Sequence, residues 1–147
     1  MSNDIKQILK EQDTVKHATE SGTKTHALLA QVVIEENKTC GRPDLVKNIL
    51  SVPGLTRFFG STSKTEVPVA GFINNRFVSR RIDRLSIDEE NKEVYILDYK
   101  TDTERDTFID IYRLQLQEYV KLISQIYPGY GIHAFILWTH KWVLERI

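Results

Sequence analysis

Apolar residues follow two different spacings along this chain, and the change falls near Ser61. Before Ser61 they recur every three or four residues, which is the spacing of a helix that buries one face. This spacing predicts a helix of about three to four turns that begins after Ser21 and Gly22 and ends near Asn37. Two further helical pieces are predicted, one from Pro43 to the break at Pro53 and Gly54 and one over residues 55–59.

After Ser61 the apolar positions alternate, which is typical of strands that bury one face. The alternation predicts strands at residues 66–73, 76–87 and 93–100, joined by turns at residues 74–75 and 89–92. An amphipathic helix at residues 108–127, ended by Pro128 and Gly129, precedes two further strands at residues 132–138 and 142–147. This order of elements predicts an α/β sandwich with a mixed sheet.

Composition narrows the class of protein. The 147 residues suffice for one domain, expected at residues 21–147, with a helical lead-in at residues 1–20. Twenty basic and twenty acidic residues cancel, which counts against a protein that coats DNA non-specifically but little against an enzyme that binds cations. No apolar run reaches membrane-spanning length and the amino terminus does not resemble a signal peptide, so we expect a cytoplasmic protein with no membrane partner.

The strand expected at residues 93–100 carries the first candidate chemistry. Alternate residues share a face, so Val94, Ile96, Asp98 and Lys100 point the same way. Charged groups in such a row are costly unless they are paired or coordinate an ion. The spacing predicts either an ion pair at the strand end or a site in which the carboxylate holds a divalent cation and the ammonium faces a phosphate. Taken alone, it favours the ion pair.

Two more segments carry polar groups toward the same region. Asp83 lies in the strand expected to pair with that of Asp98, and two converging carboxylates call for a cation; the alternative is an ion pair of Asp83 with Arg81 or Arg84. Gln115 interrupts the apolar stripe of the long helix one turn before Tyr119. A buried amide needs hydrogen-bond partners, which either a site or an ordinary core could supply.

Other motifs are weaker. His26 lies in the first predicted helix, where a lone histidine is usually a surface or core residue. Residues 60–65 faintly resemble a phosphate-binding loop but lack the glycine before Lys64, so no ATP site is expected. Arg80, Arg81 and Arg84 could contact phosphates or form a solvated strand edge.

In combination these residues resemble a known family. Gly22-x-x-x-His26, Asp83, Asp98-Tyr99-Lys100-Thr101 and Gln115-x-x-x-Tyr119 occur in the order seen in PD-(D/E)XK nucleases, and in particular in the C-terminal nuclease domain of AddA/RecB-type (UvrD-like) helicase-nucleases. The resemblance covers residues 22–147. Ile82 stands where the signature has proline, at a position that is loose in the class.

The resemblance implies a restriction-endonuclease-like α/β/α sandwich, a central mixed β-sheet flanked by helices. It also implies a role for each matching residue. His26, Asp83, Asp98 and the backbone carbonyl of Tyr99 would ligate Mg²⁺ or Mn²⁺. Lys100 would orient the attacking water, Gln115 and Tyr119 would brace the site or touch the DNA backbone, and Glu66 would be mainly structural. Arg81, Arg84 and Thr101 are weaker candidates for DNA contacts.

The implied function is a divalent-metal-dependent DNA nuclease, with exonuclease the favoured mode, in recombination and double-strand-break repair. Its partners would be DNA, as single strands or ends, and a helicase motor in cis or trans. Cys40 is the only cysteine, which excludes the four-cysteine iron–sulfur cluster of related nucleases. One alternative is a catalytically inactive DNA-binding or assembly module with the same fold. Another keeps the enzyme but changes the substrate to RNA or a restriction site.

Overall fold

The structure, a computed structural model, describes the backbone of residues 20–147 and the side chains of residues 24–147. The lead-in helix expected before residue 20 lies outside these residues. None of the helices described is both long and apolar enough to cross a membrane.

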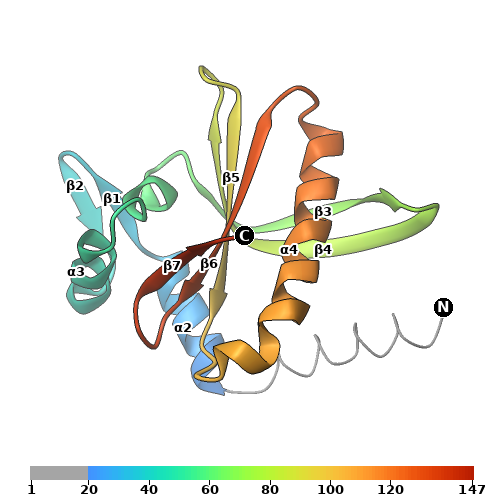
Figure 1. Cartoon of the computed structure of the whole chain (residues 1–147). Coiled ribbons are helices and arrows are strands. Elements are labelled where there is room, and N and C mark those ends of the chain that lie inside the picture. The colour runs from blue at the N-terminus through green and yellow to red at the C-terminus, as the bar shows by residue number, and fades with distance from the viewer. Residues whose placement is uncertain (1–19) are drawn as a thin grey trace.

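The centre of the fold is a five-stranded sheet with the order β3-β4-β5-β6-β7 (Figure 1). Its strands are β3 (Lys64–Ile73), β4 (Arg76–Asp88), β5 (Glu93–Lys100), β6 (Gly131–Trp138) and β7 (Val143–Arg146). All neighbours are antiparallel except β5 and β6, which are parallel. The predicted strands and their mixed arrangement are confirmed, including the pairing of the last two strands.

The helix α4 (Arg105–Ile126) connects the parallel strands β5 and β6 and covers one face of the sheet. A parallel pair requires such a crossover because no tight turn can return the chain to the same end of the sheet. Val94 and Ile96 of β5 lie in one core cluster with Leu116 and Leu122 of α4. The prediction that Val94 and Ile96 share one face of β5 is therefore confirmed, and that face meets α4.

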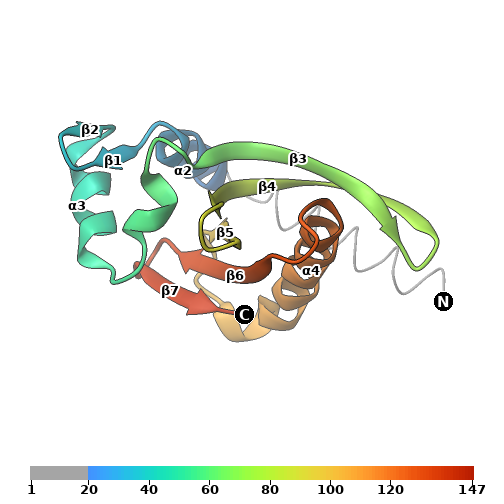
Figure 2. The same cartoon turned by 90° about the horizontal axis from the view of Figure 1, so that it is seen from above.

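The opposite face of the sheet is covered by the amino-terminal elements, as the view from above shows (Figure 2). These are α2 (Glu20–Ala30), α3 (Pro43–Ser51) and the short 3-10 helix η1 (Thr56–Phe59). Leu97 and Tyr99, on the other row of β5, lie in a second core cluster with Leu29 and Phe58. The described chain is thus a mixed sheet with helices on both faces, which is compatible with the predicted sandwich.

The first predicted helix ends earlier than expected. It stops at Ala30, and the chain then forms a small hairpin of β1 (Val33–Glu35) and β2 (Lys38–Cys40) instead of continuing to Asn37. The expected end at Asn37 is therefore wrong. Val32, Val33 and Ile34 fit the helical spacing, but side chains branched at Cβ lose rotamer freedom in a helix and favour strands.

The strands β3 and β4 continue beyond the rest of the sheet as a two-stranded arm (Figures 1 and 2). β4 pairs with β5 only from Arg84 to Asp88, whereas it pairs with β3 along residues 76–85. The arm turns at Asn74 and Asn75, whose φ angles of 51° and 63° are those of the hairpin turns that match strand twist. This confirms the predicted turn.

Candidate active site

The candidate site begins where β4 and β5 separate, at Asp83. Their last register pair is Arg84 with Leu97, so a continued ladder would place Asp83 opposite Asp98. Instead, Oδ2 of Asp83 accepts the backbone N–H of Tyr99 at 2.9 Å. The side chain thereby satisfies a backbone donor at the point where the sheet opens, and its carboxylate, 4% exposed, is fixed at that opening.

His26 approaches this opening from α2. Its Nε2 lies 3.2 Å from the backbone carbonyl oxygen of Tyr99, and its Nδ1 lies 3.9 Å from Oδ1 of Asp83. The imidazole also meets the Tyr99 ring edge-on, with 5.3 Å between the ring centroids. His26, Asp83 and the Tyr99 carbonyl therefore converge, and these are three of the four metal ligands that the resemblance implies.

The fourth expected ligand, Asp98, forms a buried ion pair with Lys100. Oδ2 of Asp98 lies 2.6 Å from Nζ of Lys100, and the two residues are 0% and 5% exposed. The simple ion pair that the spacing favours is thus present. It lies on the face of β5 that meets α4, since Lys100 contacts that helix.

A continuous polar chain runs from this ion pair into α4. Nζ of Lys100 donates to Oε1 of Gln115 at 2.8 Å, and Nε2 of Gln115 donates to the phenolic oxygen of Tyr119, also at 2.8 Å. Gln115 and Tyr119 are 4% and 0% exposed. The buried amide therefore has its partners in residues that the sequence had singled out. The geometry holds the Lys100 ammonium in one position.

Tyr112 completes the surroundings of Lys100 and was not among the predicted site residues. The Lys100 ammonium lies 4.1 Å from the centroid of the Tyr112 ring, a distance typical of a cation–π contact. The Tyr112 hydroxyl donates to the carboxylate of Asp102, which follows β5 by two residues. Tyr112 precedes Gln115 by three residues on the same stripe of the helix, and this spacing could have identified it.

Burial and nearby negative charges raise the pKa values of two tyrosines at the site. The pKa of Tyr119 is raised well above its usual value, first by burial and then by the negative charges of Asp98 and Asp83. Burial is also the main cause that raises the pKa of Tyr112, followed by its hydrogen bond to Asp102. Both phenols therefore stay protonated at neutral pH and keep their hydrogen-bonding roles.

The donors present suit a divalent cation in their chemistry. Carboxylate and carbonyl oxygens are the ligands that Mg²⁺ prefers, and imidazole suits the transition metals. Nδ1 of His26 and Oδ1 of Asp83 are 3.9 Å apart. Because Mg²⁺ lies roughly 2.1 Å from each of its ligands, one ion can contact both atoms. As they stand, no three His, Cys, Asp or Glu side chains in the described part of the chain are grouped to hold a metal.

Arg84, expected as a weaker candidate for DNA contact, is instead a buried residue with protein partners. It is 2% exposed, and its guanidinium donates to the backbone carbonyls of Leu29, Val32 and Phe58 and to the side chains of Ser63 and Tyr99, at 2.7–2.9 Å. It also lies 4.1 Å from the Phe59 ring centroid. Arg84 joins α2 and η1 to the sheet, which leaves its charge buried inside the protein.

The other weaker candidates remain near the surface. The Arg81 side chain is 67% exposed and lies 3.7 Å from Oε2 of Glu66. Thr101 directly follows β5 and is half-buried. Glu66 of β3 lies between two register pairs of β3 and β4, and the same two pairs flank Asp83 on β4. The φ angle of Glu66 is 52°. A left-handed conformation costs a residue other than glycine about 1–3 kcal/mol, and such strain collects at functional sites.

Two hollows of the surface lie elsewhere. One of about 750 Å³ is lined by Arg57, Lys64, Asp88 and Tyr95, at the end of the sheet where β4 turns into β5. Another of about 340 Å³ lies between α4 and β6, lined by Leu116, Val120, Ile132 and Ile147 among others. Neither contains the charged cluster, which we regard as the candidate site because buried, interacting charges gather at functional sites.

The sequence matches no model of a known protein family, and no curated protein shows significant similarity to it.

Proposed function

We propose that this chain is a divalent-metal-dependent DNA nuclease that hydrolyses phosphodiester bonds, with exonuclease the favoured mode. The observation that carries the proposal is the convergence of His26, Asp83 and the Tyr99 carbonyl beside the buried pair of Asp98 and Lys100. The order of these residues along the chain resembles that of PD-(D/E)XK nucleases. A mixed sheet with helices on both faces supports a restriction-endonuclease-like sandwich.

In this proposal His26, Asp83, Asp98 and the carbonyl of Tyr99 hold Mg²⁺ or Mn²⁺. The bound ion would lower the pKa of water and offset negative charge on the phosphate. Asp83 is already fixed through the Tyr99 N–H, and His26 is held against the Tyr99 carbonyl and ring, so two donors are oriented before the ion arrives.

Lys100 would position the attacking water and offset charge on the scissile phosphate. Gln115 fixes the ammonium from one side, and Tyr119 fixes Gln115 in turn. Water adds to phosphorus, the bond to one sugar oxygen breaks, and the proton lost by the water is balanced by one taken up by the leaving oxygen. No covalent intermediate with the protein is needed. By the same resemblance the setting would be DNA repair, with a helicase motor in cis or trans.

A catalytically inactive DNA-binding or assembly module is the second candidate, and one observation favours it. The Asp98–Lys100 ion pair neutralises both charges at 2.6 Å, so the buried cluster has a metal-free arrangement of its own.

Cleavage assays with the 147-residue chain separate the candidates. Linear single-stranded DNA, linear duplex, closed circular DNA and RNA are each incubated with Mg²⁺, Mn²⁺ or EDTA. The proposal predicts cleavage of linear DNA in the presence of metal and none in EDTA. Cleavage of circular DNA would replace the exonuclease mode with an endonuclease, and cleavage of RNA alone would change the substrate. Absence of cleavage together with no Mn²⁺ binding by calorimetry would favour the inactive module.

A further inference from the structure

Among the residues that the structure describes, the arm formed by residues 67–82 of β3 and β4 has one face covered and one face open. The covered face meets α4: Val69 is buried in the core with that helix, and a side chain added at Gly71 would touch Gln125 and Leu122. Because side chains alternate along a strand, the intervening residues face the other way. These are Pro68, Ala70 and Phe72 on β3 and Phe77, Ser79 and Arg81 on β4, all exposed.

Two aromatic rings stand at the outer end of this open face. Phe72 and Phe77 are register partners, they are 64% and 66% exposed, and their ring centroids are 5.8 Å apart. The backbone beneath them is fixed, since Nε2 of Gln125 donates to the carbonyl of Phe72 at 2.8 Å. An exposed aromatic pair on a fixed platform is a surface suited to binding another flat apolar group.

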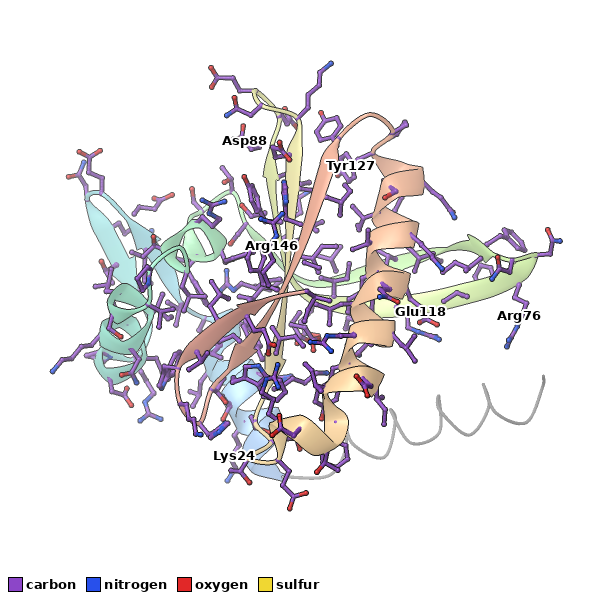
Figure 3. All side chains as sticks on the ribbon, viewed as in Figure 1. Lys24, Arg76, Asp88, Glu118, Tyr127 and Arg146 are labelled. Carbon is purple, nitrogen blue, oxygen red and sulfur yellow. The ribbon has the colours of Figure 1, made fainter. Side chains whose placement is uncertain are left out.

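The arm is also basic, although the whole chain carries no net charge. Residues 67–82 contain Arg76, Arg80 and Arg81 and no acidic residue. Arg80 pairs with Glu118 of α4 at 2.9 Å. Arg81 lies on the open face with its side chain 67% exposed and 3.7 Å from the carboxylate of Glu66. Figure 3 shows Arg76 near the outer end of the arm and Glu118 on the side of α4 that the arm crosses. The charge of the arm complements an anionic partner.

The open face leads to the candidate site. Phe77, Ser79 and Arg81 lie on one row of β4, and Asp83 follows two residues later. The alternation breaks at Asp83, because Ile82 and Leu85 both lie in the core cluster with α4. At about 3.3 Å per residue, the row spans roughly 20 Å from Phe77 to Asp83. A partner that lies along this row would reach the opening of the sheet at which Asp83 and His26 meet.

We propose that the open face of the arm binds single-stranded DNA, with Phe72 and Phe77 stacking against unpaired bases and Arg81 contacting a phosphate. The inference rests on the nuclease proposal, which supplies the site that the bound strand would reach. Aromatic side chains beside basic ones are the usual means of binding single strands, because every base has a flat face and every nucleotide has a charge. A duplex keeps its bases stacked internally and would offer the two rings only its ends.

The test measures binding without cleavage. A fluorescently labelled oligothymidylate of about 20 nucleotides is titrated with the full chain in EDTA, and anisotropy gives the affinity. The variant Phe72→Ala/Phe77→Ala is expected to bind at least about tenfold more weakly. Replacement of both residues by leucine should be as harmful, whereas replacement of both by tyrosine should preserve binding within about twofold, because tyrosine keeps the stacking surface. Arg81→Ala should lower the dependence of affinity on salt by about one ion.

Leu114→Ala is the matched control, since Leu114 is 47% exposed on α4 and lies outside the arm. It should bind as the wild type does, and circular dichroism should show all variants to be folded. The proposal is overturned if the wild type does not bind the oligonucleotide, or if the alanine variant binds as tightly as the wild type. It is also overturned if sedimentation shows that the wild type is a dimer and the alanine variant a monomer, since the rings would then contact a second copy.

The result is separable from the nuclease proposal. If the wild type cleaves nothing in any metal but the alanine and leucine variants lose affinity, the arm inference stands and the nuclease proposal fails. If the wild type cleaves DNA and its affinity does not depend on the two rings, the reverse holds.

Discussion

The ammonium of Lys100 lies 2.6 Å from a carboxylate oxygen of Asp98, and both side chains are almost completely buried. Two opposite charges in such a position neutralise each other at a large cost in lost hydration. Their arrangement determines what the site can do. Asp98 is expected to bind a cation, and Lys100 is expected to contact a phosphate or water.

Removal of either charge should destabilise the fold more than removal of both. Asp98→Asn or Lys100→Met leaves one buried charge without its counterpart, at a cost of about 3–5 kcal/mol. The double variant Asp98→Asn/Lys100→Met removes the charge mismatch, so its loss of unfolding free energy should be smaller than the loss of either single variant. Urea unfolding of the four proteins measures this cycle. Additive losses would mean that the two groups do not interact in solution.

Arg84 should matter for the stability of the fold and not for DNA binding. Arg84→Met would leave three backbone carbonyls and two side chains without their donor, with an expected cost of at least about 3 kcal/mol. Arg84→Lys should be nearly as harmful, because an ammonium cannot reproduce the planar fork of a guanidinium. Arg81→Ala is the exposed control and should change the unfolding midpoint little. Equal effects of the Arg84 and Arg81 changes would contradict the structural role.

Tyr119 should act as a positioning residue for Lys100. Tyr119→Phe removes the oxygen that accepts from Gln115, so Gln115 is free to release the ammonium. We expect the turnover number on linear DNA to fall about tenfold or more while the Michaelis constant changes little, because the group does not bind the substrate itself. Ser124→Ala, on the exposed side of the same helix, should leave both constants unchanged. A rise in the Michaelis constant alone would instead assign Tyr119 to DNA binding.

Stability should fall in alkaline solution through the buried phenols. The pKa of Tyr112 and that of Tyr119 are raised above 10.0, so the folded state retains protons that the unfolded state releases. Their contribution is therefore fully present below pH 10, the unfolded pKa, and is lost as the pH rises above it. Unfolding free energies measured from pH 8 to 11, with Tyr112→Phe and Tyr119→Phe for comparison, test this sign. Each phenylalanine variant should show a weaker alkaline decline than the wild type.

Local patterns predicted the elements whose ends carry strong signals. The asparagine pair at 74–75 defines the arm's turn, and Pro128 with Gly129 ends α4, so the strands and the long helix were predicted within a few residues. The predicted helix continues wrongly past Ala30 because the short apolar run there fits the helical spacing, although its branched side chains favour a strand. Pairing with β2 makes this run a strand. Tertiary contacts outweigh such weak local preferences.

The candidate site could also be predicted from the sequence only in part. The face of β5 and the stripe of α4 place Asp98, Lys100, Gln115 and Tyr119 together, and both rows could be read from periodicity. The burial of Arg84 could not, because its acceptors come from α2, η1 and the loop before β3, segments with no periodic relation to β4. A run of arginines in a sequence does not distinguish a buried guanidinium from an exposed one.

The most direct test of the nuclease proposal compares the wild type with Asp98→Asn for cleavage of linear DNA in Mn²⁺, with Mn²⁺ binding followed by calorimetry. Asp88→Asn is the control. Asp88 lies at the far end of β4, where its carboxylate accepts a hydrogen bond from Asn91. The proposal predicts that the wild type and Asp88→Asn bind Mn²⁺ and cleave, while folded Asp98→Asn binds it more weakly and does not cleave. Cleavage by Asp98→Asn at the wild-type rate, or a wild type that neither binds Mn²⁺ nor cleaves, would contradict it.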